Sequence, residues 1–410
     1  MTHAERLDRL AEIAVRIGVN VQKGQELVIN APLDARALVQ RLAAHAYDAG
    51  AALVVPLFAD DVIQRARFIH ADEESFDFAP SWLFDGVAKA LDQGAAMLSI
   101  SGSDPMLLAG CDPSRIGRAQ RAAAAAMKPM RNIISSFATN WSILSFATPG
   151  WAESVFPDDA PDAAVGRLWD AIFKVSRIDE ADPVGAWQAH VARLRERCDT
   201  LNGHRFAALQ FRGPGTDLRV GLATDHLWAG GAVEAANGAV CMPNMPTEEV
   251  FTMPHRDKVD GVVAATKPLV HGGSLIEGIS VRFEAGRIVE AHASAGQDVF
   301  RSLIGTDEGA ARLGEVALVP EASPVARSGL IFRNTLFDEN AACHIALGQA
   351  LALNMKGGCD AARGANESLI HIDWMIGSGQ VDVDGVTATG AVVPVMRAGE
   401  FTLRPVLIST

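Results

Sequence analysis

The N-terminal half of the sequence alternates short apolar segments with longer amphipathic ones, and this alternation restricts the possible folds more than any other feature. Segments 26–32 (ELVINAP), 51–59 (AALVVPLFA) and 95–105 (AAMLSISGSDP) have the apolar, β-branched character of buried strands. Helices are expected between them, at 35–50 and around 84–93. Since parallel strands need a crossover connection, the pattern predicts an α/β domain with a doubly wound, mostly parallel sheet.

The sequence pattern changes after about residue 201. Short apolar segments separated by Gly and Pro follow, and strands are expected at 207–211 and 217–222. This pattern is typical of an α+β domain dominated by antiparallel pairing. We therefore expect an N-terminal α/β domain over residues 1–201 and a C-terminal domain over 202–410, which contains the candidate catalytic and metal-binding residues.

Charge and cysteine content argue against several classes of partner. The net charge of −13 and the pI near 5.3 disfavour nucleic-acid binding, which usually requires a basic surface. No stretch approaches about 18 uninterrupted apolar residues, and the N-terminus is typical of a charged amphipathic helix rather than a signal peptide. Five cysteines, without a CxxC pair, indicate reduced thiols. We expect a cytoplasmic protein with no membrane or nucleic-acid partner.

A polar pair, His371 and Asp373, interrupts the otherwise apolar segment LIHIDWMI, which has the composition of a strand. Residues i and i+2 of a strand point to the same face, so the imidazole and the carboxylate are expected side by side. Burying both requires a partner, because an unpaired buried charge costs several kcal/mol. The pair therefore either belongs to a metal site or forms a hydrogen-bonded His–Asp pair that faces solvent or holds a loop.

Two further candidates, Glu339 and His344, lie in the segment DENAACHIALG. The Ala- and Leu-rich composition predicts a helix over 338–355, with Asp338 or Asn340 as its N-cap. Residues at i and i+5 of a helix are about 140° apart in projection, so the two side chains would share a face only if Glu339 precedes the first turn. A histidine on an apolar helix can equally be a core residue, so this segment alone does not define a site.

Acidic residues upstream complete a possible set. Glu248 and Glu249 lie in CMPNMPTEEVFTMPH, whose Pro and Met content predicts an irregular loop that leads into a short strand. Glu315 lies at the start of LGEVALVP, a predicted strand. Each acid alone could be a solvated strand end. Acids, histidines and an aspartate that recur beside strands in one half of the chain are nevertheless the pattern expected of a two-metal site.

Several long segments resemble, in order, those of a known family. They are GTDLRVGL, GGAVEAANGAVCMPNMPTEEVFTMPH, VDGVVAATKPL, GTDEGAARLGEVALVP, SGLIFRNTLFDENAACHIALG and HIDWMIGS, with TPGWAESVFPD as a looser match in the N-terminal half. These motifs are similar to those of the aminopeptidase T family, also called the thermophilic metalloprotease or aminopeptidase S family. The similarity is densest over residues 213–379.

The resemblance implies a metal-dependent aminopeptidase that hydrolyses the N-terminal peptide bond of peptides with a free N-terminus. It also implies a homodimer and two divalent metal ions that activate a water, with Zn, Co, Mg or Mn as candidates for this oxygen and nitrogen donor set. Glu339 or Glu248 would be the catalytic proton-transfer group, and Glu339 could instead be a further ligand. The family's metal ligands fall on Glu249, Glu315, His344, His371 and Asp373.

One position departs from the family pattern. The family's tyrosine, seven residues after the first metal-binding histidine, corresponds to Leu351, and the single tyrosine of the chain is Tyr47. This departure leaves open a catalytically impaired metal-binding homologue. A mononuclear non-haem Fe(II) ring-cleaving dioxygenase is a second alternative, because His344, His371 and Asp373 alone satisfy the two-histidine, one-carboxylate set of such enzymes.

Overall fold

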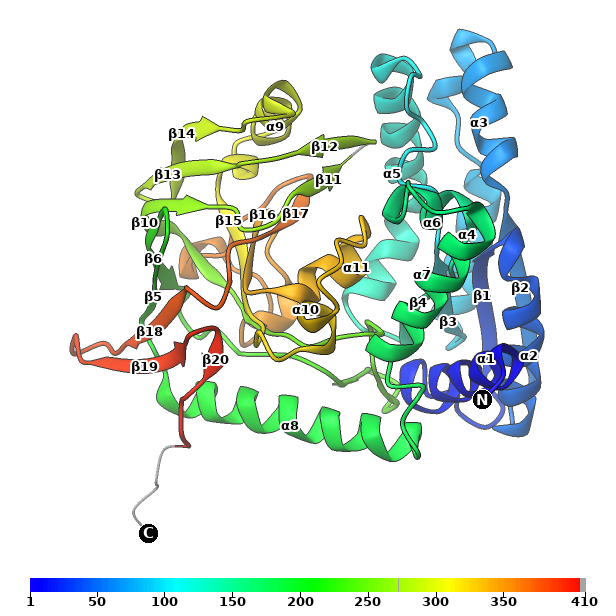
Figure 1. The fold of residues 1–410 in the computed structure, drawn as a ribbon, viewed down its shortest axis with the longest axis horizontal. Helices are drawn as coiled ribbons and strands as arrows, with labels where there is room; N and C mark the ends of the chain where they lie inside the picture. Colours follow the sequence, from blue (N-terminus) through cyan, green and yellow to red (C-terminus); the bar gives the residue numbers. More distant parts are fainter. Residues whose placement is uncertain (272, 406–410) are drawn as a thin grey trace. The chain divides into compact units, whose positions relative to one another are not determined.

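The computed structural model describes residues 1–271 and 273–405 of the 410-residue chain. Within it the chain forms two compact units, which can be followed by residue number in Figure 1. The first unit contains Met1–His190 and Ala232–Pro246, and the second contains Val191–Gly231 and the chain from Thr247 onwards. Each unit has its own sheet structure.

The first unit is built on a four-stranded sheet in the order β2-β1-β3-β4. All three strand pairs are parallel, and Leu27 of β1 lies opposite both Val54 of β2 and Ala96 of β3. This confirms the predicted α/β architecture with a parallel sheet. The strands are β1 (Glu26–Pro32), β2 (Leu53–Ala59), β3 (Ala96–Ser101) and β4 (Trp141–Ser145).

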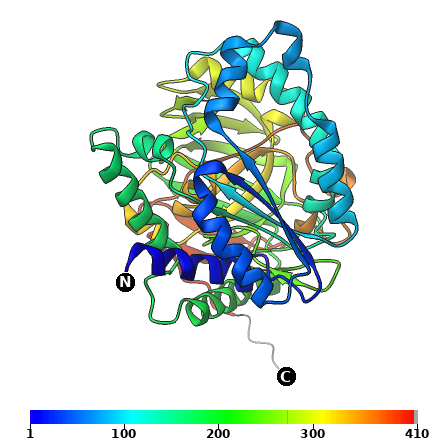
Figure 2. The same ribbon diagram turned by 90° about the vertical axis from the view of Figure 1, so that its right-hand side faces the viewer.

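Helices alternate with these strands along the chain, as the sequence pattern predicts. Helix α2 packs against β1 and β2 (Figure 2), and α1 packs against α2. Val28 and Met97 of the sheet pack with Val87 of α4 and Met130 of α5 in one apolar cluster. The helices are α1 (His3–Ile13), α2 (Arg36–Asp48), α3 (Asp61–His70), α4 (Ser81–Asp92), α5 (Pro113–Ser135), α6 (Pro149–Val155) and α7 (Pro161–Val175).

The division between the units is less simple than one boundary after residue 201. Helix α8 (Pro183–His204) continues through that residue, and residues 232–246 return to the first unit. This returning segment contains β7 (Val233–Glu234) and β8 (Val240–Cys241), and the N–H of Met242 donates to the carbonyl of Gly18 at 2.7 Å. No helix of the described residues combines the length and apolar character needed to cross a membrane.

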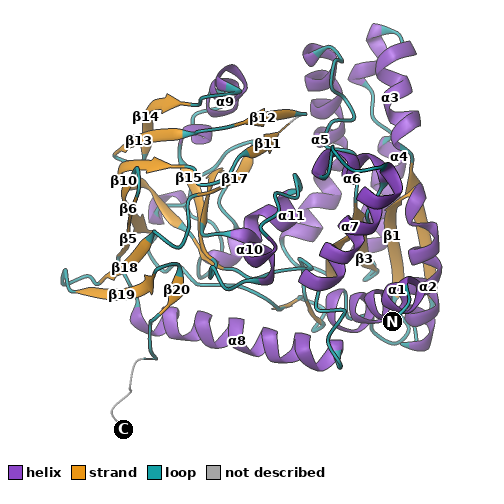
Figure 3. Cartoon of the chain, viewed as in Figure 1, coloured by secondary structure: helices purple, strands orange, loops and turns teal. Residues whose placement is uncertain are grey.

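The second unit contains two antiparallel sheets, in agreement with the predicted α+β pattern (Figure 3). An eight-stranded sheet has the order β14-β13-β10-β6-β5-β18-β19-β20, a four-stranded sheet has the order β17-β16-β15-β9, and β11 and β12 form a separate hairpin. The strands are β5 (Ala208–Gly213), β6 (Thr216–Leu222), β9 (Val250–Thr252), β10 (Pro254–Ala264), β11 (Leu269–His271), β12 (Ser274–Ile276), β13 (Ser280–Glu284), β14 (Arg287–His292), β15 (Leu313–Leu318), β16 (His344–Gly348), β17 (His371–Met375), β18 (Asp382–Val386), β19 (Val392–Arg397) and β20 (Glu400–Phe401). The helices are α9 (Gln297–Ile304), α10 (Pro324–Ser328) and α11 (Thr335–Asp338).

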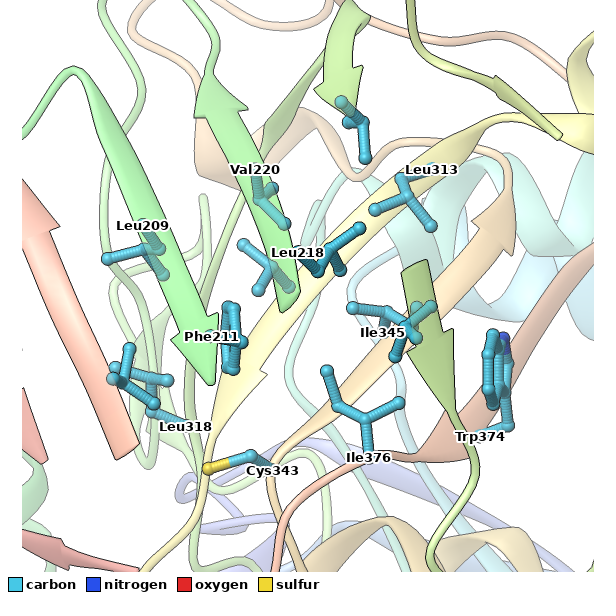
Figure 4. Packing of buried hydrophobic residues seen from close by; sticks show 14 of the residues in the cluster. Leu209, Phe211, Leu218, Val220, Leu313, Leu318, Cys343, Ile345, Trp374 and Ile376 are labelled. Carbon is cyan, nitrogen blue, oxygen red and sulfur yellow. The ribbon is translucent and has the colours of Figure 1, made fainter. Parts of the chain in front are cut away.

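The core of the second unit unites side chains of both sheets (Figure 4). The eight-stranded sheet contributes residues such as Phe211 and Val220, and the four-stranded sheet contributes Ile345 and Trp374. Because side chains alternate between the two faces of a strand, the residues next to Ile345 and Trp374 point away from this core. The second face of the four-stranded sheet is therefore the one that can carry polar groups.

The helix predicted over 338–355 is wrong. Helix α11 ends at Asp338, a 3₁₀ turn covers Glu339–Ala341, and His344–Gly348 is strand β16. Strand β16 is paired on both sides, with β15 and with β17, and all of its residues are buried. A strand enclosed in this way shows no polar alternation, and its Ala and Leu content therefore gave a helical pattern.

Candidate metal centre

Three neighbouring strands bring the predicted ligands together. Ala346 at the centre of β16 lies opposite Glu315 of β15 on one side and opposite Asp373 of β17 on the other. A bulge in β15 next to Glu315 shifts the register there, and Val316 and Leu318 face the core instead. The face opposite the core therefore carries Glu315, His344, His371 and Asp373.

Glu249 joins them from the loop that precedes β9, which pairs with β15. His344 Nε2 lies 3.1 Å from Glu249 Oε2 and 3.6 Å from Glu315 Oε1. His371 Nε2 lies 3.7 Å from Glu315 Oε2 and 3.4 Å from Asp373 Oδ1. All five residues that the sequence identified as ligands thus converge on one site.

In the described part of the chain, these residues form two groups of possible metal ligands. One contains Glu249, Glu315 and His344, and the other contains Glu315, His371 and Asp373, with the ligand atoms of each group within 4.8 Å of one another. Glu315 belongs to both groups and presents a different carboxylate oxygen to each histidine. A carboxylate shared in this way is suited to bridge two ions.

The oxygen and nitrogen atoms of the site are better suited to bind a cation than to form hydrogen bonds with one another. Glu249 Oε2 and Asp373 Oδ1 are buried without a hydrogen-bond donor among the described residues, although an imidazole nitrogen lies near each. Buried carboxylate oxygens without donors are costly unless a cation is bound. Oxygen and nitrogen donors without thiolate suit zinc, cobalt, manganese or magnesium.

Backbone carbonyls orient both imidazoles. His344 Nδ1 lies 3.2 Å from the carbonyl oxygen of Ala342, and His371 Nδ1 lies 2.7 Å from that of Gln349. A neutral imidazole that donates through Nδ1 presents the lone pair of Nε2 to the site, which is how metal-binding histidines are usually held. These carbonyl partners could not be identified from sequence, because any residue type supplies a carbonyl.

The pKa values of the imidazoles show how strongly the carboxylates act on them. Burial alone lowers the pKa of His371, but Asp373 and Glu315 outweigh burial and raise the pKa to about 10. Burial likewise opposes protonation of His344, yet Glu249 and Glu315 hold its pKa well above the usual value. In the metal-free protein, protons on the imidazoles balance the carboxylates. A divalent ion would displace them.

The two candidate proton-transfer residues have different surroundings. Glu339 is buried in the 3₁₀ turn, where burial first, and then repulsion by Glu249 and Asp373, raises its pKa well above the usual value. Glu248 is also buried and, like Glu339, belongs to neither ligand group, but its charge acts on Arg197 of α8. The electrostatic effect of Glu249 and Asp373 on Glu339 therefore makes Glu339 the stronger candidate for the acid or base of the site.

Both neighbours of Glu339 hold loops in place. The carboxylate of Asp338 accepts the N–H groups of Phe332 at 2.7 Å and Asn334 at 3.1 Å. The Asn340 side chain accepts the N–H of Glu248 at 2.6 Å, which fixes the loop that carries Glu249. From sequence, Asp338 and Asn340 were predicted only as helix caps, although their place beside Glu339 in the DEN motif was a signal for a role at the site.

Cys343 and Leu351 flank strand β16 without contributing a reactive group. Burial raises the pKa of the Cys343 thiol to about 11, which leaves almost no thiolate at neutral pH. Leu351 is half-buried and immediately precedes the 3₁₀ turn Ala352–Asn354. The only tyrosine, Tyr47, lies in α2 of the other unit.

Comparison with known proteins gives one consistent family. Residues 3–401 match the model of the family described as thermophilic metalloprotease (M29). The chain is 52% identical over 401 residues to aminopeptidase T of Thermus thermophilus, covering 97% of this chain and 98% of the relative. It is 44% identical to aminopeptidase AmpS of Bacillus subtilis, with 97% and 98% coverage. The solved structure of wild-type AmpT from Thermus thermophilus superposes with a TM-score of 0.93, covering 97% of this chain and 99% of that chain at 52% identity.

Proposed function

The chain belongs to the thermophilic metalloprotease (M29) family, and from this premise we propose that it is a metal-dependent aminopeptidase with a two-metal centre. The observation that carries the proposal is the pair of ligand groups joined by Glu315. The substrate would be a peptide with a free N-terminus, and the products an amino acid and the shortened peptide. Neither the oxygenase nor the impaired homologue draws support from the comparisons.

Five residues would hold the two ions. Glu249 and His344 would hold one, His371 and Asp373 the other, and Glu315 both. Zinc, cobalt, magnesium or manganese bound there would lower the pKa of a water towards neutrality and polarise the scissile carbonyl. The carbonyls of Ala342 and Gln349 would keep the Nε2 atoms of both histidines directed at the site.

Glu339 is the proposed proton carrier. Its carboxylate takes a proton from the attacking water as the water oxygen bonds to the carbonyl carbon and the C=O π electron pair moves onto the carbonyl oxygen. The same carboxyl group then donates this proton to the amide nitrogen, the C–N bond breaks and the carbonyl re-forms. Burial and neighbouring carboxylates raise the pKa of Glu339, which suits a group that must both accept and donate a proton near neutral pH. Glu248 is the less favoured candidate, because its charge acts on Arg197.

The buried carboxylates of the site are compatible with recognition of a free N-terminus. Glu249, Glu315, Glu339 and Asp373 are buried, and burial together with the other three carboxylates raises the pKa of Glu339. Two divalent ions would neutralise most of this negative charge, so the α-amino group would be recognised by direct contact with one carboxylate or one ion rather than by a general negative potential. An acetylated N-terminus is uncharged and bulkier and could not make this contact, which would restrict cleavage to the chain end.

The test is the release of free amino acids from short peptides by metal-loaded protein. We expect release from an unblocked peptide, none from its N-acetylated form, and loss of release in His371→Ala. His292→Ala serves as the matched control, because His292 is exposed at the end of β14. Equal hydrolysis of blocked and unblocked peptides would refute an aminopeptidase, and full activity of His371→Ala would refute the assigned centre.

We also infer that the protein is a cytoplasmic homodimer. Large apolar side chains of the first unit are exposed on α3 and α4, including Val62 at 77%, Ile63 at 73% and Trp82 at 76%. Exposed apolar groups of this size are typical of interaction surfaces. All five cysteines lie in the described residues and are free there, which suits a reducing compartment. Light scattering should show a dimer for the wild type and a monomer for a Val62→Asp, Ile63→Asp variant.

A further inference from the structure

A small cavity adjoins the metal centre in the second unit. Its volume is about 10 Å³, which is room for about one water-sized group. Asp373 and Glu339 line one part of it, and Leu269 and Met375 contribute apolar wall. Among the described residues that line it, Arg333 alone has a cationic side chain. Arg333 therefore lines the same cavity as a proposed ligand, Asp373, and the proposed proton carrier, Glu339.

The backbone at Arg333 is held in an unusual conformation. Its φ of 54° lies in the left-handed region, which is unfavourable for a residue with a side chain. The carboxylate of Asp338 compensates by accepting the N–H groups on both sides, from Phe332 and from Asn334. Phe332 is fully buried and stacks on Phe337 with ring centroids 4.6 Å apart. A conformation enforced from two sides in this way is typical of residues with a functional role.

We propose that Arg333 is a catalytic residue whose guanidinium group binds the oxygen of the scissile carbonyl as that oxygen becomes negatively charged. The proposal rests on the aminopeptidase function proposed above. A guanidinium group stays protonated at any physiological pH and offers several N–H donors. Apolar walls weaken screening by water, so the same charge stabilises an oxyanion more strongly than it would in solution.

The position of Arg333 agrees with the chemistry of the two neighbouring groups. When the water oxygen bonds to the carbonyl carbon, Glu339 gains the proton and the carbonyl oxygen gains the electron pair. The cavity is lined by Glu339 and by Arg333. The proton acceptor and the proposed hydrogen-bond donor to the oxyanion therefore adjoin the same small space. Room for a single water-sized group fits one oxygen atom better than the two oxygens of a peptide's terminal carboxylate.

The test compares Arg333→Gln and Arg333→Lys with the wild type and with Arg327→Gln, an exposed arginine on the neighbouring helix α10. We expect Arg333→Gln to lower kcat by about 10²- to 10³-fold with little change in KM, as removal of an oxyanion donor does elsewhere. Binding of a phosphinic dipeptide analogue, which mimics the tetrahedral intermediate, should weaken by a similar factor in calorimetry. Metal content and binding of the product amino acid should not change, Arg333→Lys should retain part of the activity, and Arg327→Gln should match the wild type.

Several outcomes would overturn the assignment. An unchanged kcat and unchanged analogue binding in Arg333→Gln would do so. A rise in KM limited to free-acid dipeptides, with amidated dipeptides unaffected, would instead assign Arg333 to a terminal carboxylate. If Arg333→Gln loses metal or folds poorly, Arg333→Ala with added guanidinium decides the matter, since rescue supports a chemical role and absence of rescue contradicts it. An inactive wild type would refute the aminopeptidase proposal itself, whereas an active wild type with an equally active Arg333→Gln refutes only the role of Arg333.

Discussion

Replacing Glu315 by Gln should reduce the stability that the protein gains from bound metal, without reducing the stability of the metal-free protein. Glu315 is 4% exposed and is the one residue common to both ligand groups in the described chain. The Gln side chain has nearly the same shape but lacks the charge and offers one oxygen in place of two. Each group then falls from three anionic or imidazole ligands to two.

The expected size of the effect follows from this loss. Removal of even an indirect partner of a metal ligand costs about 10- to 100-fold in affinity, so loss of a shared ligand should cost at least about 100-fold. A factor of 100 is about 2.8 kcal/mol, because each tenfold change in affinity is about 1.4 kcal/mol. When the metal concentration exceeds the dissociation constants of the wild type and of Glu315→Gln, bound metal should stabilise the wild type by about 2.8 kcal/mol more than it stabilises the variant. At roughly 2–4 °C per kcal/mol for a unit of this size, the Tm gain should differ by about 6–11 °C.

The metal-free proteins should show no such deficit. Burial raises the pKa of Glu315, His344 and His371 oppose this rise, and the charges of Glu249 and Asp373 add to it; the pKa is raised on balance, so the ionised carboxylate is unfavourable there without a cation. We therefore expect metal-free Glu315→Gln to be at least as stable as the metal-free wild type. Calorimetric unfolding with and without zinc, after dialysis against a chelator, measures both quantities. Glu308→Gln, an exposed residue, is the control. An equal zinc-induced Tm gain in variant and wild type would refute the bridging role.

Three further predictions follow from the surroundings of the site. Glu339→Gln should lower kcat by about 10²- to 10⁴-fold while both ions stay bound, and loss of metal would instead identify Glu339 as a ligand. The pKa of His371 is raised to about 10, so its stabilisation of the metal-free protein should be complete below pH about 6.5 and disappear as the pH rises through about 10. Urea midpoints of metal-free wild type and His371→Gln should therefore converge towards high pH, and a constant difference would contradict the assignment. Asn340→Ala should cost about 1–3 kcal/mol in urea unfolding, because it leaves the buried N–H of Glu248 without its acceptor, and a cost near zero would show that this N–H finds another partner.

The sequence predicted the parts of the fold that local patterns determine. Strands β15 and β17 were recognisable because each is an apolar segment with polar residues at fixed places, Glu315 near the start of β15 and the pair His371 and Asp373 in β17. Strand β16 was not, since a strand with neighbours on both sides and both faces buried shows no alternation. The return of residues 232–246 to the first unit was also invisible, because it depends on contacts between residues that are far apart in sequence.

The candidate site also has features that the sequence predicted and features that only the folded chain shows. The five proposed ligands could be named from motifs, but their grouping around Glu315 depends on the register of three strands. The carbonyls that orient the imidazoles and the left-handed backbone at Arg333 are properties of the folded chain.

The number of metal ions per chain tests the central claim most directly. Protein purified anaerobically without added metal, and then the same protein titrated with zinc, should be analysed by mass spectrometry of its metal content. We predict two ions per chain for the wild type at saturation, and about one for His371→Ala and for Glu249→Gln, because each variant loses a ligand of only one group. One ion or none in the saturated wild type would contradict a two-metal centre at these residues.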